Sequence, residues 1–424
     1  MWIRKANEKI IVILIGILMF ASFDISYAAQ KTLNVGIGIT GGQQRSAYDR
    51  VAKIFAGENP DTRIHYTMTL VTDYKEKFPD WLKSKRGLDV LYWQGGERLY
   101  SYIREGYILP IDRIWSEEGW DLQFTNAAKK AVTFKESIYA VPTSYYQWGF
   151  YYRRSLFDKL SISPPETWQE FLILCQLLKS HGITPITIGT KNHWTAAAWF
   201  DYLDLRINGF KFHKNLLAGN TSYTSPQVRK VFEVWKSLVD KQYFTTDANL
   251  YNWTEVLPLL YRNKGGMLLM GNFVTNKFSS VIVEDIDFFR FPLMANNIPV
   301  SEEAPTDVFV IPKNTQNETL AEKFIAFMGR ADIQGMLNKH LGTIPPNINA
   351  EISDNHFVQK GVDTLLKAEG ITQYFDRDVI KEMSGPSIRI FSSFLQSGDI
   401  DKAVTRLEAE RIKNYKTTKI SKEE

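Results

Sequence analysis

The stretch Ile138–Arg154, with the sequence IYAVPTSYYQWGFYYRR, carries six aromatic residues after its proline. Five of the six are Tyr or Trp, which combine an apolar ring with a hydrogen-bonding edge. A sugar ring has the matching character, with an apolar C–H face and hydroxyl groups at its rim. Phe150 and Tyr152 are expected to be strand or core residues, because aromatic residues favour strands. Three others lie beside a Pro-Thr-Ser turn, and the sequence leaves open whether they pack in a core or bind a ligand: Tyr145, Tyr146 and Trp148.

Aromatic and polar residues also follow two predicted strands. The strand 88–93 ends at Trp93 and is followed by Gln94 and two glycines, and the strand 182–188 is followed closely by Trp194. In open α/β sheets, ligands bind beyond the C-terminal ends of parallel strands. We therefore predict Gln94 and Trp194 as ligand-binding residues, and Trp93 either as a ligand-binding residue or as a core anchor.

The glycines at positions 36, 38 and 41 match the G-x-G-x-x-G fingerprint of dinucleotide-binding folds. That fingerprint requires an acidic residue at the end of the next strand, where it holds the ribose. Here the next strand ends Met68-Thr69-Leu70, so we predict no nucleotide cofactor. The glycine turn leads instead into a helix N-terminus, where backbone N–H groups and the amides of Gln43 and Gln44 can meet a polar ligand.

The common catalytic and metal-binding motifs are absent from the sequence. It contains no G-x-S-x-G, no H-E-x-x-H and no P-loop, and none of the six histidines pairs at ligand spacing on a helix. We predict neither a catalytic residue nor a metal site. The acidic pairs Glu117-Glu118 and Glu302-Glu303 are interpreted as solvated loop charges. A hydrolase can bring two distant carboxylates together, so an enzyme stays an alternative.

Strands and helices alternate along the chain. The strand 32–39, the helix 46–55 and the strand 63–70 form a βαβ unit, which favours an α/β fold with parallel strands. Thr167–Glu170 has the pattern of a capping box, and Cys175 lies on the apolar face of the helix that it begins. With 424 residues the chain is long enough for two domains. The net charge of +4 and the lack of a basic run argue against nucleic-acid binding.

Residues 1–28 have the layout of a secretory signal peptide. Arg4, Lys5 and Lys9 precede the apolar run Ile10–Phe20, and Ser26-Tyr27-Ala28 provides a small-residue cleavage site. The apolar run is shorter than the ~20 residues that a membrane-spanning helix needs. We predict export to the periplasm with cleavage after Ala28, and a retained N-terminal anchor is the alternative.

Six segments resemble those of a known family in their sequence, order and spacing: FAGENP at 55–60, YAVP at 139–142, WGFYY at 148–152, PPETWQEF at 164–171, KGGMLLMGN at 264–272 and AEKFIAFM at 321–328. Over residues 30–415 the chain resembles the periplasmic solute-binding proteins of ABC importers. The resemblance is to the large group that binds sugars and oligosaccharides and includes maltose-binding protein.

The resemblance implies a two-lobed, type II periplasmic-binding-protein fold of the α/β class, in which each lobe is a mostly parallel sheet flanked by helices. A hinge joins the lobes, and we expect it to be crossed three times, near 142–145, 291–294 and 313–319. Residues 29–142 with 294–316 would form the N-terminal lobe, 143–293 with 317–415 the C-terminal lobe, and 416–424 a mobile tail. A monomer without cofactor is implied.

The resemblance also implies ligand contacts at matching positions: Gln43, Gln44, Trp93, Gln94, Tyr145, Tyr146, Asn272 and Phe273, with weaker matches at Trp194 and Asp307. Near Met383–Pro386, where relatives often place another aromatic residue, the chain has Ser384-Gly385-Pro386, which implies a more open site. Aromatic rings with amide and carboxylate groups suit a neutral carbohydrate. Arginines near the expected loops leave an acidic sugar open: Arg45, Arg98 and Arg153.

Three functions follow from these expectations. The first is a receptor that captures a sugar or oligosaccharide between two lobes and delivers it to an ABC transporter permease in the inner membrane. The second is the same fold serving as the ligand-binding partner of a sensor kinase or chemoreceptor. The third is a secreted carbohydrate-active enzyme.

Overall fold

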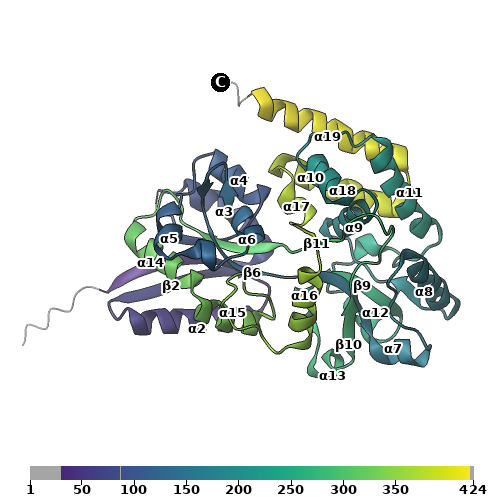
Figure 1. The fold of residues 1–424 in the computed structure, drawn as a ribbon, viewed down its shortest axis with the longest axis horizontal. Helices are drawn as coiled ribbons and strands as arrows, with labels where there is room; N and C mark the ends of the chain where they lie inside the picture. Colours follow the sequence, from purple (N-terminus) through teal and green to yellow (C-terminus); the bar gives the residue numbers. More distant parts are fainter. Residues whose placement is uncertain (1–29, 86, 421–424) are drawn as a thin grey trace, which may run out of the picture.

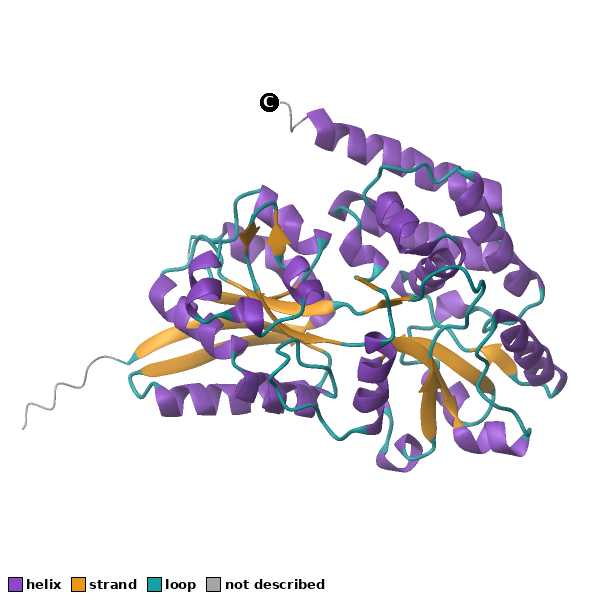
Figure 2. Ribbon diagram, in the orientation of Figure 1, coloured by secondary structure: helices purple, strands orange, loops and turns teal. Residues whose placement is uncertain are grey.

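The computed structural model describes residues 30–85 and 87–420, and it consists of two lobes that lie side by side (Figure 1). The predicted signal peptide, residues 1–28, lies outside the described residues. Each lobe has its own β-sheet with helices around it (Figure 2). Within the described residues, no helix is both long and apolar enough to cross a membrane.

The first lobe is built on a five-stranded sheet with the order β2-β1-β3-β12-β6. β1 pairs in parallel with β2 and β3, whereas β12 is antiparallel to β3 and β6. The sheet thus takes strands from widely separated parts of the chain: β1 (Lys31–Ile39), β2 (Thr62–Leu70), β3 (Val90–Gln94), β6 (Val141–Tyr145) and β12 (Thr306–Val310).

The glycines of the apparent dinucleotide fingerprint serve packing. A Cβ on Gly36 would lie 2.7 Å from Leu88 and from Leu91, and one on Gly38 would lie 3.1 Å from the ring of Tyr74. The Tyr74 hydroxyl donates to the carbonyl oxygen of Tyr92 at 2.8 Å. β1 therefore carries glycine because α3 (Val71–Lys83) lies directly on it, which agrees with the prediction that these glycines belong to a strand.

Helices from two parts of the chain cover the first sheet: α2 (Gly42–Glu58), α3, α4 (Glu97–Arg104), α5 (Asp112–Glu117), α6 (Asn126–Lys130), α14 (Glu318–Gly329) and α15 (Ala331–Leu341). Two short strands, β4 (Thr133–Phe134) and β5 (Ser137–Ile138), form a hairpin beside them.

The placement of α14 and α15 corrects the expected lobe boundary. Phe55 of α2 packs against Phe324 and Phe327 at ring-centroid distances of 5.3 and 5.1 Å, and Leu337 lies in the same core. Residues 318–341 therefore belong to the first lobe, although we assigned 317–415 to the second. The chain does not leave the first lobe at 313–319. The amphipathic pattern of α14 reveals an apolar face but does not identify the sheet that this face covers.

The second lobe has a four-stranded sheet with the order β10-β7-β9-β8. β7 is antiparallel to both of its neighbours, and only β8 and β9 run in parallel. Both sheets are thus mixed rather than mostly parallel. The strands are β7 (Trp148–Arg153), β8 (Thr184–Ile186), β9 (Gly265–Gly271) and β10 (Ile286–Phe289).

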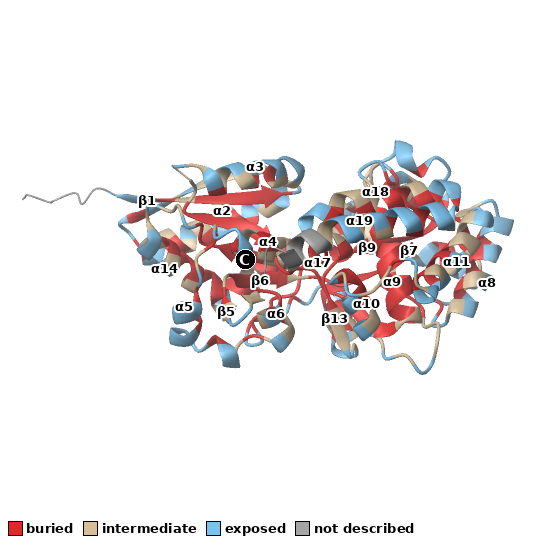
Figure 3. Cartoon of the chain, turned by 90° about the horizontal axis from the view of Figure 1, so that it is seen from above, coloured by how far each residue is buried: buried red, intermediate tan, exposed pale blue. Residues whose placement is uncertain are grey.

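Helices surround the second sheet, and their outer faces are exposed while the strands are buried (Figure 3). They are α7 (Arg154–Lys159), α8 (Trp168–Ser180), α9 (Ala197–Ile207), α10 (Gly209–Leu217), α11 (Pro226–Asp240), α12 (Leu257–Tyr261), α13 (Ser280–Val283), α16 (His356–Leu366), α17 (Phe375–Asp378), α18 (Lys381–Ser397) and α19 (Ile400–Ile420). The capping box predicted at Thr167 and Glu170 is present, and Cys175 is buried in α8 as predicted. α19 extends through residues 416–420, which we expected to be part of a tail.

The hinge consists of three crossings. The first runs from Tyr145 to Trp148, between β6 and β7. The second passes through β11 (Ser301–Glu303), which pairs in parallel with β13 (Gly370–Thr372). The third follows Ile344, whose N–H and carbonyl groups bond to the backbone of Tyr145 at 2.9 and 3.0 Å. The first and third crossings are therefore paired with each other.

Pro142 lies inside β6, which is possible because β6 is an edge strand and the register shifts beside it, between Asp307 and Val308. One detail of the hinge differs from expectation. Glu302 and Glu303 are 1% and 0% exposed, whereas we interpreted them as solvated. Strand pairing of β11 places them in the interior, and the sequence gives no sign of that pairing.

Candidate functional site

Six aromatic residues gather where the second lobe meets the hinge, and we call them the aromatic cluster: Tyr146, Trp148, Trp194, Trp253, Phe273 and Tyr374. Trp148 on β7 stacks on Tyr374 with ring centroids 4.8 Å apart. Phe273 lies edge-on to Tyr146 at 5.3 Å and to Trp253 at 5.5 Å. Trp194, Trp253 and Phe273 are only half-buried, so part of each ring surface is available to a ligand.

Two of the three buried rings of the aromatic cluster, Tyr374 and Trp148, differ in their hydrogen bonding. The hydroxyl of Tyr374 accepts a hydrogen bond from the N–H of Ala198 at 3.0 Å and donates to the carbonyl oxygen of Trp194. The buried indole N–H of Trp148 has no hydrogen-bond partner within the described part of the chain. A buried donor without a partner costs free energy, about 1–3 kcal/mol. Trp148 is 2% exposed, so this unpaired donor lies in the interior of the aromatic cluster.

Five ionisable residues from both lobes lie near one another beside the aromatic cluster, and two ion pairs among them connect the lobes. We call them the interlobe charge cluster: Lys75, Arg98, Asp307, Asp376 and Arg377. Arg98 of α4 pairs with Asp376 of α17 at 2.7 Å, and Asp307 of β12 pairs with Arg377 at 3.1 Å. Arg377 also donates to the hydroxyl of Tyr146 at 2.8 Å. Tyr146 thus joins the charges to the rings.

Burial and neighbouring charges shift the pKa values of these groups in opposite directions. Burial raises the pKa of Asp307 above its usual value, although Arg377 opposes the shift. For Asp376, burial also acts to raise the pKa, but Arg98, Lys75 and Arg377 outweigh it and the pKa is lowered. Burial, followed by repulsion from Arg98, lowers the pKa of Lys75 to about 7. The site therefore contains a lysine that changes charge near neutral pH.

The structure brings five of the residues predicted from the sequence to this place: Tyr146, Trp148, Trp194, Phe273 and Asp307. They come from the hinge, β7, the 3-10 helix Trp194–Ala196, the 3-10 helix Asn272–Lys277 and β12. Tertiary contacts alone bring these segments together. Tyr146 and Trp148 were recognisable beside the Pro-Thr-Ser turn and Trp194 after a predicted strand, whereas Phe273 and Asp307 were predicted only from the family resemblance.

Three other predicted residues are occupied by structural contacts. Trp93 is 3% exposed and stacks on Phe78 with ring centroids 3.6 Å apart, so it is the core anchor that the sequence left open. Asn272 is fully buried, accepts from the Tyr151 hydroxyl at 3.1 Å and donates to the carbonyl of Gly342. The buried Gln94 amide oxygen accepts from Arg98. A strand-end position does not reveal whether a side chain turns into the core.

The remaining predicted residues lie at the margin of the site. The exposed Gln43 amide donates to the carbonyl oxygen of His340 at 3.1 Å, and the Gln44 side chain accepts from the hydroxyl of Thr40 at 3.1 Å. The backbone carbonyl of Thr40 also accepts from Lys277 of the second lobe at 2.9 Å, so this loop touches both lobes. Tyr145 packs against the small apolar group around Ile344.

Sequence reasoning missed Lys75, Trp253, Tyr374, Asp376 and Arg377, and noted Arg98 only as a nearby cation. The segment 374–377 carries two aromatic residues followed by two opposite charges, and this composition was the available signal. Met383 is buried in α18, and Tyr374 supplies an aromatic ring to the cluster. The more open site implied by Ser384-Gly385-Pro386 stays a prediction.

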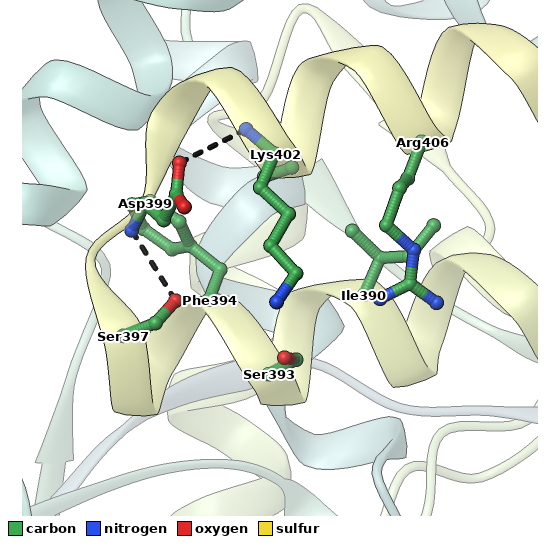
Figure 4. Close-up of a pocket in the computed structure, with 8 residues that line it drawn as sticks. Ile390, Ser393, Phe394, Ser397, Asp399, Lys402 and Arg406 are labelled. Carbon is green, nitrogen blue, oxygen red and sulfur yellow. Dashed lines mark hydrogen bonds between the residues drawn. The ribbon is translucent and has the colours of Figure 1, made fainter.

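A hollow between α18 and α19 is too small to be the ligand site. Its volume is about 10 Å³, which is close to the minimum for one water molecule. Figure 4 shows Lys402 and Arg406 lying over Ile390 and Phe394 there. Among the described residues, no group of three or more His, Cys, Asp or Glu side chains is arranged to hold a metal ion.

Comparison with known proteins identifies the family. The family model for bacterial extracellular solute-binding proteins matches residues 41–335. An uncharacterized ABC transporter extracellular-binding protein of Pyrococcus horikoshii is 24% identical over 379 residues, covering 87% of this chain and 84% of the relative. A multiple sugar-binding protein of Streptococcus mutans is 21% identical over 347 residues, covering 74% and 78%.

A solved structure supports the same conclusion about the fold. The bacterial solute receptor AcbH, which has an exclusive substrate preference for β-D-galactopyranose, matches with a TM-score of 0.85 at 24% identity. The match covers 92% of this chain and 99% of that one. The predicted two-lobed fold is thus confirmed, and the chain belongs to the bacterial extracellular solute-binding proteins.

Proposed function

We propose that this protein is a receptor that captures a sugar or oligosaccharide between its lobes and delivers it to an ABC transporter. The observation that carries the proposal is the aromatic cluster, which keeps the faces of Trp194, Trp253 and Phe273 partly open beside charged groups from both lobes. Aromatic faces with a few convergent polar groups are typical of sites that orient a ligand having both apolar and hydroxylated surfaces. The sugar-binding description of the Streptococcus mutans relative agrees with this ligand class.

Binding in this proposal requires lobe closure and no chemical step. A sugar ring would lie against the half-buried rings while one of its hydroxyl groups bonds to Asp307, whose side chain is 18% exposed. Closure about the three hinge crossings would bring α4 and β12 of the first lobe against α17 of the second. Arg98 would then pair with Asp376 and Asp307 with Arg377, as in this structure. The closed form would be the one that a membrane permease recognises. The protein would release its ligand unchanged and would not be an enzyme.

The proposal extends to location and assembly. The signal-peptide pattern of residues 1–28 supports export to the periplasm, where the protein would act as a monomer on a permease in the inner membrane. The transporter description of the Pyrococcus relative supports this partner over a sensor kinase or chemoreceptor. No cofactor takes part.

Thermal melting of the chain without residues 1–28 tests the proposal, using a panel of mono- and oligosaccharides. A ligand present at ~100 times its dissociation constant, and binding only the native state, should add about 2.7 kcal/mol of stability. Trp253→Ala should abolish the shift. Trp168→Ala is the matched control, because Trp168 is also a half-buried tryptophan of the second lobe but packs on Phe171, away from the aromatic cluster. If no saccharide shifts the melting of the folded protein, the proposal is wrong.

A further inference from the structure

Lys75 differs from the other members of the interlobe charge cluster. It lies on α3, is half-buried, and forms no hydrogen bond or ion pair with any residue that the structure describes. Its electrostatic neighbours are Arg98 on α4, Asp307 on β12, and Asp376 and Arg377 on α17. These four residues come from three elements and both lobes.

The charges around Lys75 do not balance. Arg98 is paired with Asp376 at 2.7 Å and Arg377 is paired with Asp307 at 3.1 Å, so each carboxylate already has a guanidinium partner. Lys75 is therefore an additional positive charge in a partly dehydrated place. An unpaired cation is unfavourable there, and it loses its proton easily unless an anion approaches.

The additional charge adjoins the aromatic cluster. Arg377, a neighbour of Lys75, donates to the Tyr146 hydroxyl at 2.8 Å and lies over the Tyr146 ring. Tyr146 in turn contacts Phe273, whose ring is half-buried. A single ligand that reaches from the open rings to Lys75 would therefore place a sugar face at one end and meet a cation at the other.

We propose that the preferred ligand is an acidic saccharide, with a uronic-acid carboxylate placed at Lys75 and a sugar ring against Phe273 and Trp253. This inference rests on the proposed function and specifies its substrate class. The carboxylate completes a third ion pair beside the two that already exist. A neutral sugar at the same place would leave the charge of Lys75 without a partner, and its affinity is lower for that reason.

Titration calorimetry with matched pairs of ligands tests this inference: galacturonate against galactose, glucuronate against glucose, and short oligouronates against their neutral counterparts. The wild type should bind the acidic member of at least one pair ten times or more tighter. Lys75→Met should remove that difference while keeping the side-chain volume. Lys77→Met, an exposed lysine on the same helix, should leave it unchanged.

The pH dependence supplies a second readout that a merely structural lysine would not give. Because the pKa of free Lys75 is about 7, a carboxylate that pairs with it must draw in a proton when binding occurs above pH 7. Affinity for the acidic ligand should be flat below pH 7 and fall above it, approaching tenfold per pH unit. Arg98, Arg377, Asp307 and Asp376 face Lys75 as well, so Lys75→Met must flatten this profile for the assignment to Lys75 to hold.

The possible failures are distinguishable. Equal affinity for acidic and neutral members, or equal weakening of both by Lys75→Met, would overturn the inference and leave the sugar receptor standing. A uronate preference that survives in Lys75→Met would also overturn it. Absence of binding by every neutral and acidic saccharide would overturn the proposed function together with the inference.

Discussion

Glu303 and Asp201 form a buried acid pair beside the hinge. Both side chains are 0% exposed. The Oδ2 atom of Asp201 accepts a hydrogen bond from the backbone N–H of Phe375 at 2.7 Å. Burial raises the pKa of Asp201 to about 7, and burial followed by the nearby Asp201 raises the pKa of Glu303 well above its usual value. The folded protein therefore keeps a proton here that the unfolded chain releases.

Glu303→Gln should make the stability less dependent on pH. A raised pKa in the folded state means that stability is full below the unfolded pKa and declines as pH rises toward the folded value. Because Gln imitates the protonated acid, the variant should lose less stability than the wild type between pH 5 and pH 8. The difference is about 1.4 kcal/mol for each unit of pKa shift removed.

Urea unfolding at both pH values measures this effect. Glu118→Gln, which changes an exposed acid, is the control and should follow the wild type. Parallel stability profiles for Glu303→Gln and the wild type would show that Glu303 holds no proton in the folded state.

At the scale of elements, the contact between α14 and the helical segment around Trp120 fixes the C-terminal end of α14 to the first lobe. A Cβ on Gly329 would lie 2.0 Å from the ring of Trp120, which is 1% exposed. Gly329→Ala should therefore cost about 1–3 kcal/mol, as overpacking in a rigid core does. Gly57→Ala is the matched control, because Gly57 also lies in a helix but its Cβ would meet no atom within 4 Å.

The control should be neutral or stabilising by up to about 1 kcal/mol, since alanine favours helix more than glycine does. Urea unfolding of both variants gives the comparison. If Gly329→Ala is as stable as the wild type, α14 is not packed against Trp120 and the corrected lobe boundary is wrong.

Elements with local signals could be predicted from the sequence, and those that depend on distant partners could not. Thr167 and Glu170 form the capping box of α8, and the alternating residues 32–39 form β1. Both patterns are local, so both elements were predicted. The burial of Glu302 and Glu303 depends on the pairing of β11 with β13, almost 70 residues away, and was missed.

The same distinction holds within the site. Tyr146 and Trp148 were recognisable because they lie in an aromatic-rich stretch beside a turn, and Phe273 because its position matches that of a family ligand contact. Lys75 and Arg377 lie on helices whose sequences resemble ordinary charged surfaces, and only the approach of the two lobes makes them neighbours. A single sequence does not encode which surface charges will meet across a hinge.

At the scale of the whole molecule, ion pairs between the lobes stabilise the arrangement seen here. Arg98 and Asp376 have side chains that are 15% and 12% exposed, so solvent screens this pair less than a surface pair. Arg98→Met should shift the unliganded protein toward more open forms and increase its radius of gyration in X-ray scattering. It should weaken ligand binding about fivefold, corresponding to ~1 kcal/mol.

Lys236→Met is the control for this experiment, because Lys236 pairs with Asp240 at 2.6 Å inside the second lobe. It should leave the radius of gyration unchanged. An unchanged scattering profile for Arg98→Met, together with wild-type affinity, would mean that the pair does not contribute to closure.

Titration calorimetry of wild type and Trp253→Ala with the saccharide that gives the largest thermal shift tests the central claim most directly. We expect one molecule of sugar to bind per chain, and the affinity to fall at least tenfold in Trp253→Ala but not in Trp168→Ala, which lies outside the aromatic cluster. Binding that is unaffected by Trp253→Ala would contradict the assignment of the site between the lobes.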